Sequence, residues 1–155
     1  MKIYISGKIG EENPSPETLA RFKAAEDMLK SKGYETFNPT TSGLGQHAES
    51  MAQKNGTNFY EEILMLDMQE VKKCDAIYMM GDFFGSDGAT AEYYYAIALK
   101  KTVFFEDKQY ARYFLDQQLM KKIRNVELEL SPNSSFLQAS KAYFEKKKDK
   151  IWLPL

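Results

Sequence analysis

Short apolar runs alternate along the chain with longer stretches in which apolar residues recur at every third or fourth position. The short runs are rich in Ile, Tyr, Val and Phe and predict buried strands at residues 2–6, 34–37, 75–80 and 101–105. The longer stretches predict amphipathic helices at residues 16–31, 58–73 and 89–100. This order predicts an α/β fold, flavodoxin-like or Rossmann-like, with a parallel sheet of about five strands and helices on both faces.

Local signals mark the ends of some of these elements. Ser15 followed by Pro16 is typical of a helix start, and Gly33 is placed to end the same helix. Residues 40–56 carry small and polar side chains with little periodicity, so we expect a long loop there. A loop of that length inside a compact domain is often a lid or a binding loop, and disorder in the free protein is an equal alternative.

The last third of the chain continues the alternation less clearly. We expect a helix at residues 108–122, a fifth strand at 126–130, a further helix from Ser131, and an apolar tail at 151–155. The length of 155 residues favours one domain, which we divide into a core at 2–105 and a C-terminal extension at 106–155.

Composition and net charge exclude several classes of partner and site. The net charge is −1, which gives no electrostatic reason to expect a polymeric nucleic acid or an anionic membrane as a partner. The chain has one cysteine, Cys74, and one histidine, His47, so it offers no disulfide framework and no cysteine-rich or histidine-rich metal site. No apolar run reaches the roughly 20 residues that a membrane span needs. We therefore expect a cytoplasmic protein with no metal site built from cysteine or histidine.

The stretch from Asp67 to Leu99 concentrates the candidate chemistry. It reads as the end of a helix, a buried strand, a glycine-bearing loop and a second helix. The carboxyl end of such a strand, facing a helix N-terminus, is where open α/β sheets bind ligands. The stretch contains five carboxylates, which are Asp67, Asp75, Asp82, Asp87 and Glu92.

Two of these carboxylates stand out by position. Glu92 falls in the first turn of the predicted helix, where it is either a nucleophile or general base, or an ordinary first-turn glutamate stabilised by the helix dipole. Asp67 shares a helix face with Leu64 and Val71, so it is exposed at the helix edge, paired, or functional. For Asp75 a structural role at a turn is favoured, and solvation is the simplest interpretation of Asp82 and Asp87.

Two glycine-bearing loops follow neighbouring predicted strands. The first contains Ser6, Gly7 and Lys8, and the second contains Ser86, Asp87 and Gly88. With a helix N-terminus between them, such loops can hold a phosphate through backbone N–H groups. Neither loop has the spacing of a Walker loop or of a dinucleotide fingerprint, so each is a weak signal alone.

The combination of these motifs resembles the nucleoside 2-deoxyribosyltransferase superfamily, which includes 2-deoxynucleoside 5′-monophosphate N-glycosidases. The resemblance rests on IYISG at residues 3–7, on Asp67 eight residues before Asp75, and on SDG at residues 86–88 leading to Glu92. It covers residues 2 to about 105 and is closest to a bacterial and phage branch of that superfamily. It implies the same α/β fold and no cofactor.

The resemblance also implies roles for individual residues. Glu92 matches the glutamate that attacks C1′ of the deoxyribose, and Asp67 matches the acid that assists the departing base. Tyr4 matches a tyrosine beside the sugar, and Ser86 matches a serine that holds a 5′-phosphate. The transferases tend to carry an aspartate at that place, and here Asp87 is adjacent. The remaining residues expected to bind substrate are Ser6, Gly7, Lys8 and Gly88.

The expected function is therefore cleavage of an N-glycosidic bond, or deoxyribosyl transfer, on 2′-deoxynucleosides or their 5′-monophosphates. Such a reaction passes through an oxocarbenium-like state that a carboxylate can stabilise or trap. The resemblance further implies a homodimer or higher homo-oligomer. Two alternatives remain open, namely a nucleotide-binding or sugar-binding module without turnover and a phage-type accessory protein that acts through protein contacts.

Overall fold

The computed structural model describes residues 1–10 and 13–107, in which four strands form one parallel sheet in the order β2-β1-β3-β4. The strands are β1 (Lys2–Ser6), β2 (Glu35–Phe37), β3 (Ala76–Met79) and β4 (Thr102–Phe105). The helices are α1 (Pro16–Ser31), α2 (Leu44–Asn55), α3 (Phe59–Lys73) and α4 (Asp87–Ala98), with a short 3-10 helix η1 at Phe83–Gly85. The predicted α/β class with a flavodoxin-like parallel sheet is confirmed.

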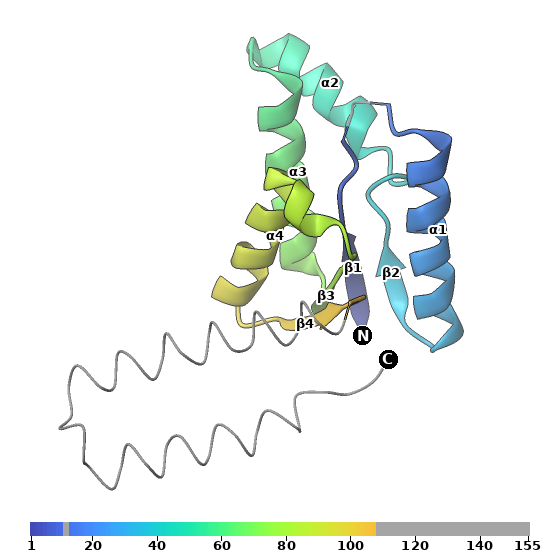
Figure 1. Cartoon of the computed structure of the whole chain (residues 1–155). Helices are drawn as coiled ribbons and strands as arrows, with labels where there is room; N and C mark the ends of the chain where they lie inside the picture. The colour runs from blue at the N-terminus through green and yellow to red at the C-terminus, as the bar shows by residue number, and fades with distance from the viewer. Residues whose placement is uncertain (11–12, 108–155) are drawn as a thin grey trace, which may run out of the picture. The chain divides into compact units, whose positions relative to one another are not determined.

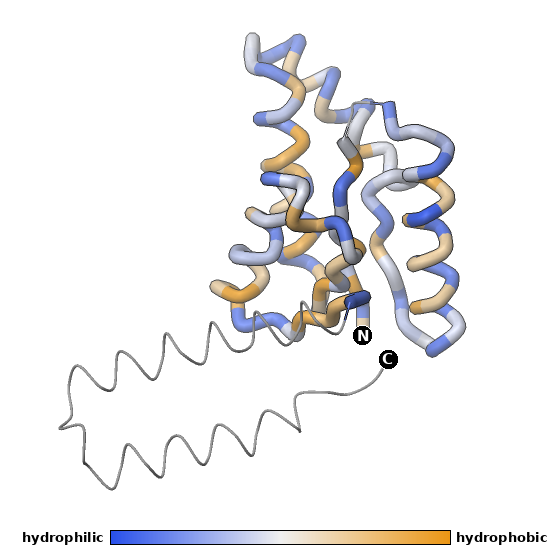
Figure 2. The backbone as a smooth tube through the Cα atoms, viewed as in Figure 1, coloured by the Kyte–Doolittle hydropathy of each residue, from blue (hydrophilic) through white to orange (hydrophobic). Residues whose placement is uncertain are grey.

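Helices cover both faces of this sheet. Figure 1 shows α1 on one side of the strands and α3 with α4 on the other, while α2 lies beside α3 at the end of the domain. Figure 2 shows hydrophobic and hydrophilic residues alternating along α1 and α3, as amphipathic helices require. On α1 the buried residues are Phe22, Ala25 and Leu29. The central strands β1 and β3 are buried on both faces, which explains their continuous apolar runs.

Alternation along the strands decides which side chains reach which layer. Successive residues of a strand point to opposite faces, so Tyr4 and Ser6 of β1 share one face and Ile3 and Ile5 share the other. Tyr4 and Ser6 face α4, because both contact Glu92 on that helix. The β1–β3 register pairs Ser6 with Met79, so the carboxyl ends of the two central strands lie side by side.

The two predicted ends of α1 are confirmed, and α3 has a cap that the sequence analysis did not single out. The Ser15 side chain accepts a hydrogen bond from the backbone N–H of Thr18, and Pro16 occupies the first helical position. Gly33 follows the end of α1 with φ +83°, a conformation that favours glycine. Asn58 caps α3 in a reciprocal arrangement with Glu61 that satisfies two backbone donors.

One predicted loop and one predicted helix start are wrong. Most of the segment at residues 40–56, expected to be a loop, is the helix α2, which is framed by Gly43 and Gly56 with positive φ angles. Helix α2 has few apolar residues and most of them are small, so its helical periodicity is weak. Its buried residue is Ala48. Helix α4 starts at Asp87 instead of residue 89, because Ser86 caps it and glycine is tolerated in a first turn.

The described sheet has four strands, whereas the sequence predicted about five. The predicted fifth strand at 126–130, the predicted helices around it and the apolar tail lie outside the described residues. Within the described part of the chain, no helix combines the length and the apolar character that crossing a membrane demands.

Candidate active site

The candidate site lies where the connections from the central strands diverge. From β1 the chain passes through α1 to β2 on one side, and from β2 it returns through α2 and α3 to β3 on the other. The carboxyl ends of β1 and β3 therefore form the switch point of the sheet, the usual ligand position in open α/β folds. Four sequence-predicted residues converge near the carboxyl end of β1, namely Tyr4, Ser6, Asp67 and Glu92.

Glu92 is the centre of this cluster. Its carboxylate is buried, and each of its oxygens accepts a hydrogen bond from a hydroxyl group on β1. The Tyr4 hydroxyl donates to Oε1 at 3.0 Å, and the Ser6 hydroxyl donates to Oε2 at 2.5 Å. Two donors fix the orientation of the carboxylate, so Glu92 is held in one position on α4.

Asp67 supplies a second buried carboxylate from α3. It is 7% exposed, and its Oδ1 atom has no hydrogen-bond partner among the described residues. Leaving a buried polar atom unpaired costs roughly 1–3 kcal/mol, more when the group is charged. A native carboxyl group that carries this cost is a candidate for contact with a ligand.

The two carboxylates raise each other's cost of ionisation. Burial raises the pKa of Glu92 above its ordinary value, and the negative charge of Asp67 raises it further, while the hydroxyls of Ser6 and Tyr4 act in the opposite direction. Burial likewise raises the pKa of Asp67, which the Tyr4 hydroxyl partly offsets. The pair therefore retains a proton more readily than two solvated carboxyl groups.

Tyr4 lies between the two carboxylates and is itself buried. Its ring stacks on Phe37 of β2, with centroids 5.5 Å apart and planes inclined by 10°. Burial raises the pKa of the Tyr4 hydroxyl well above its usual value, and the charges of Glu92 and Asp67 add to this effect. The hydroxyl therefore stays protonated and remains a hydrogen-bond donor.

The helix dipole contributes less to Glu92 than the sequence suggested. Because α4 begins at Asp87, Glu92 lies in its second turn, and the acidic residue of the first turn is the exposed Asp87. The effect of a helix dipole falls off within the first turn. Hydroxyl donors from β1, and not the helix terminus, therefore supply the local stabilisation of a charged Glu92.

The first glycine-bearing loop divides into parts with different roles. Ser6 is buried against Glu92 and does not join the loop surface. Gly7 is needed for packing, because a Cβ atom there would lie 2.9 Å from Sδ of Met80. Lys8 is exposed, and its side chain runs beside Gly85, just before the N-terminus of α4.

The second loop presents the start of α4. The Ser86 hydroxyl accepts a hydrogen bond from the backbone N–H of Ala89 and caps the helix, which leaves its own proton available to a ligand. Gly88 lies beside the Tyr60 hydroxyl, since a Cβ atom built there would be 3.6 Å from it. Asp87 is exposed, in agreement with the solvated interpretation.

The other two carboxylates of the segment are structural. Asp75 accepts a hydrogen bond from the backbone N–H of Lys2 at 2.7 Å and so joins the starts of β1 and β3. Asp82 forms an ion pair with Arg21 at 2.5 Å and accepts a hydrogen bond from the backbone N–H of Lys8. These contacts tie the first loop and α1 to the loop after β3.

Comparison with known proteins adds the family. Residues 1–105 match the family described as Domain of unknown function (DUF4406). The chain belongs to this family. No curated protein and no solved structure matches it.

In this DUF4406 protein, two residues of the site were not recognised from the sequence in their present roles. Ser6 was grouped with the glycine loop, although the two-residue period of β1 places it on the same face as Tyr4. Phe37 supports the Tyr4 ring through the β1–β2 register, which pairs these two residues. In the described ranges 1–10 and 13–107, no three His, Cys, Asp or Glu side chains are grouped so as to hold a metal ion.

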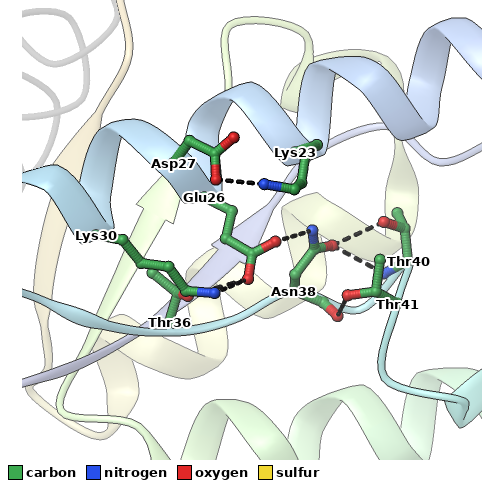
Figure 3. Close-up of polar contacts among 8 residues, drawn as sticks. All are labelled: Lys23, Glu26, Asp27, Lys30, Thr36, Asn38, Thr40 and Thr41. Atoms are coloured by element: carbon green, nitrogen blue, oxygen red, sulfur yellow. Dashed lines mark hydrogen bonds and ion pairs between the residues drawn. The ribbon is translucent and has the colours of Figure 1, made fainter.

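A second carboxylate network fixes the chain just after Phe37. Figure 3 shows Glu26 of α1 joined to Asn38, whose amide nitrogen donates to Oε2 at 3.1 Å, and to Lys30, which donates to Oε1 at 2.5 Å. The amide oxygen of Asn38 accepts hydrogen bonds from the backbone N–H and the hydroxyl of Thr40. The network anchors the end of β2, and with it the ring that stacks on Tyr4.

Proposed function

We propose that this protein cleaves the N-glycosidic bond of 2′-deoxynucleosides or their 5′-monophosphates, or transfers the deoxyribosyl group, with Glu92 as the nucleophile. One observation carries the proposal. A buried glutamate with a hydroxyl donor on each oxygen faces a second buried carboxyl group, at the switch point of the sheet. A protein that only binds a ligand has no need of such a costly pair.

The pair suits a double displacement at an anomeric carbon. An oxygen of ionised Glu92 forms a bond to C1′ while the bond between C1′ and the base nitrogen breaks, and the electron pair of that bond leaves with the base. Because positive charge develops on the sugar, the nearby carboxylate stabilises the transition state and then holds the sugar as a glycosyl ester.

Asp67 supplies the proton for the departing base. Burial raises the pKa of Asp67 to about 7 and that of Glu92 to about 8, so the pair holds a proton near neutral pH. In this mechanism Asp67 carries that proton and transfers it to the base nitrogen or carbonyl as the bond breaks. In the second step water or an incoming base attacks C1′ and gives its proton to Asp67, now ionised. The bond between C1′ and the Glu92 oxygen breaks, and its electron pair restores the Glu92 carboxylate. Water gives hydrolysis with release of the sugar, and another base gives transfer.

The resemblance of residues 3–7, 67–75 and 86–92 to the nucleoside 2-deoxyribosyltransferase superfamily supports the same reaction class. That resemblance names the same three residues, Tyr4, Asp67 and Glu92, that geometry brings together. The motifs that carry the resemblance lie in three separate segments of the sequence, and the fold brings their key residues together. This agreement supports a sugar-transfer site.

The surroundings of α4 favour a 5′-monophosphate over a nucleoside. No acidic partner is found for the Lys8 ammonium group within the described residues, and its side chain lies beside Gly85 at the start of α4. Backbone N–H groups of a first helical turn and the Ser86 hydroxyl complement an anion there.

The surface suggests an oligomer. Large apolar side chains are exposed on α3, η1 and α4, namely Tyr60, Met65, Phe84 and Tyr94. We propose that this surface is covered in a homo-oligomer. Light scattering at micromolar concentration is the direct test, and a mass equal to one chain would contradict the proposal.

The deciding experiment is a panel of 2′-deoxynucleosides and 5′-monophosphates incubated with the protein and analysed for free base by chromatography. We expect base release by the wild type and none by Glu92→Gln. The matched control is Glu49→Gln, which makes the same change on an exposed face of α2. Ligand-induced stabilisation without base release would indicate a binding module instead.

The phosphate preference needs its own variant. Ser86→Asp keeps a good helix cap but places a negative charge at the start of α4, so it separates capping from anion binding. We expect it to raise KM for monophosphates by tenfold or more, which corresponds to about 1.4 kcal/mol, and to change KM for nucleosides little. An equal change for both substrate classes would contradict a phosphate site.

A further inference from the structure

We infer that Ser6 is the positioning residue that makes Glu92, and not Asp67, the ionised member of the carboxylate pair. The role of Ser6 in catalysis rests on the proposed function. Which of the two carboxyl groups holds the proton can be tested without it. Two buried carboxylates that interact need something to make them unequal, because otherwise the proton is shared between them and neither has a defined role.

The first step concerns Tyr4. Its hydroxyl carries one proton, so it can donate to one carboxylate at a time. In this structure it donates to Oε1 of Glu92 at 3.0 Å. Tyr4 lies near both carboxylates, however, so a small rotation of its O–H bond would favour the other one. Tyr4 alone therefore gives only a weak preference for a charged Glu92.

The second step concerns Ser6. Its hydroxyl donates to Oε2 of Glu92 at 2.5 Å, and it is 1% exposed, so water does not compete for that bond. No other hydrogen bond of the Ser6 side chain is found within residues 1–10 and 13–107. The donation is therefore committed to Glu92, and it favours the charged form of that carboxylate.

The third step concerns Asp67. Its Oδ1 atom has no hydrogen-bond partner among the described residues, so nothing there compensates a negative charge on that oxygen. The neighbouring charge of Glu70 further disfavours its ionisation. A protonated Asp67 removes this penalty and leaves an O–H group that can serve as an acid. Burial raises the pKa of both carboxyl groups, to about 8 for Glu92 and to about 7 for Asp67, so burial does not by itself place the proton on Asp67. The assignment to Asp67 rests on the hydrogen bonds, because Glu92 has two hydroxyl donors, whereas Asp67 shares one and leaves Oδ1 unpaired.

The prediction is that removing the Ser6 hydroxyl moves the proton toward Glu92. The groups that set the titration of Glu92 are Ser6 and Tyr4 of β1 and Asp67 of α3, with Glu70 acting through Asp67. In Ser6→Ala, Oε2 of Glu92 loses its donor while the other groups stay. We expect the apparent pKa of Glu92 to rise by about one unit, the size of one hydrogen bond to a charged group.

The measurement is a carbon-13 NMR titration of labelled glutamate carboxyl groups in the full chain. The Glu92 signal is assigned by its absence in Glu92→Gln. Ser6→Thr keeps the hydroxyl and should titrate like the wild type, whereas Ser6→Cys, which fits the same space with a weak donor, should shift in the same direction as Ser6→Ala. Thr36→Val is the matched control, because it removes a strand hydroxyl that contacts Glu26 instead of Glu92.

The kinetic consequence provides the second readout. With a substrate in hand, Ser6→Ala should lower kcat about two- to threefold at neutral pH, because a one-unit rise in pKa leaves a mostly ionised carboxyl group mostly protonated. KM should change less than twofold, and the loss of kcat should shrink as pH rises and Glu92 ionises again. A merely structural role would lower activity without moving the pH profile. If no substrate is found, the NMR titration still decides the inference. A Glu92 titration that is the same in Ser6→Ala and wild type would overturn it.

Discussion

Two carboxylate clusters lie at the ends of neighbouring strands in this domain, and they are built in opposite ways. Beyond β2, Glu26 receives hydrogen bonds from Lys30 and Asn38, and these lower its pKa, the Lys30 contact most strongly. At β1, Glu92 and Asp67 have no cation among their recorded partners in residues 1–10 and 13–107, and burial raises both pKa values. We therefore expect the first cluster to stabilise the fold and the second to cost stability.

The difference shows how a structural carboxylate can be told from a functional one. Both clusters are well placed and both include buried groups, so burial alone does not separate them. What separates them is whether each oxygen has a partner that favours the negative charge. Glu26 has a cation on one oxygen and an amide on the other, whereas Asp67 leaves an oxygen unpaired.

The largest expected effect separates the clusters by activity. Glu92→Gln should lower kcat by about 10³-fold or more, because the amide cannot form a glycosyl ester and the oxocarbenium-like state loses its stabilising charge. Glu26→Gln makes the same chemical change in the other cluster and should keep kcat within about twofold. Steady-state kinetics on any substrate from the panel gives both values. Equal losses in the two variants would mean that the clusters do not differ in function.

The next effect is on stability and has an unusual sign. Asp67→Asn should stabilise the protein at pH 8 by about 1–3 kcal/mol, because it removes a buried group that resists ionisation. The folded-state pKa of Asp67 is raised, so wild-type stability is fully present below its unfolded-state pKa, near 4, and is lost as pH rises through the raised value. The gain from Asp67→Asn should therefore grow from pH 5 to pH 8.

Urea denaturation at a series of pH values measures this gain. The matched control is Asp27→Asn, which makes the same change in an exposed ion pair with Lys23, where the expected effect is small at every pH. Asp67→Asn should also slow the release of bases that are poor leaving groups more than the release of good ones, because acid assistance matters most for poor leaving groups. A loss of stability that is constant with pH would show that Asp67 is a structural group.

Much of the fold could be predicted from the sequence because its signals are local. Residues that favour helix starts occur at the first turns of α1 and α3, namely Ser15, Pro16 and Asn58. The sequences of β1 and β3 are continuously apolar because both faces of these strands are buried. The helix at residues 44–55 was missed because Ala48 and its neighbours form a weak apolar stripe between two glycines. A small residue such as Ala48 is enough for a helix that packs against its neighbour with little apolar surface, but it gives only a weak hydrophobic periodicity in the sequence.

The sequence analysis named both carboxylates and Tyr4 of the candidate site, but it did not predict that Ser6 contacts Glu92. Glu92 and Asp67 could be identified because charged residues beside buried strands are conspicuous and because the motif spacing matched a known superfamily. The Ser6 contact joins residues 86 positions apart, and the Glu26 contact joins α1 to Asn38 across the chain reversal at Gly33. Such pairings depend on register and helix orientation, which periodicity alone does not determine.

The smallest expected effect completes the comparison from the structural side. Glu26→Gln should destabilise the domain by about 1 kcal/mol at pH 7, because Lys30 loses its ion-pair partner and the Asn38 amide loses a charged acceptor. The folded-state pKa of Glu26 is lowered, so its contribution is present above the unfolded-state pKa, near 4, and is lost as pH falls through the lowered value.

The same urea series therefore gives the opposite slope from Asp67→Asn, with the effect of Glu26→Gln greatest at pH 7 and vanishing toward pH 3. Lys23→Gln is the control, because it breaks the exposed pair with Asp27 and affects Glu26 only through charge, the weakest of the causes that lower the pKa of Glu26. Because Asn38 follows Phe37 directly, a weakened network should also loosen the ring that stacks on Tyr4. A Glu26→Gln variant whose stability matched wild type at all pH values would contradict the stabilising role of the Glu26 network.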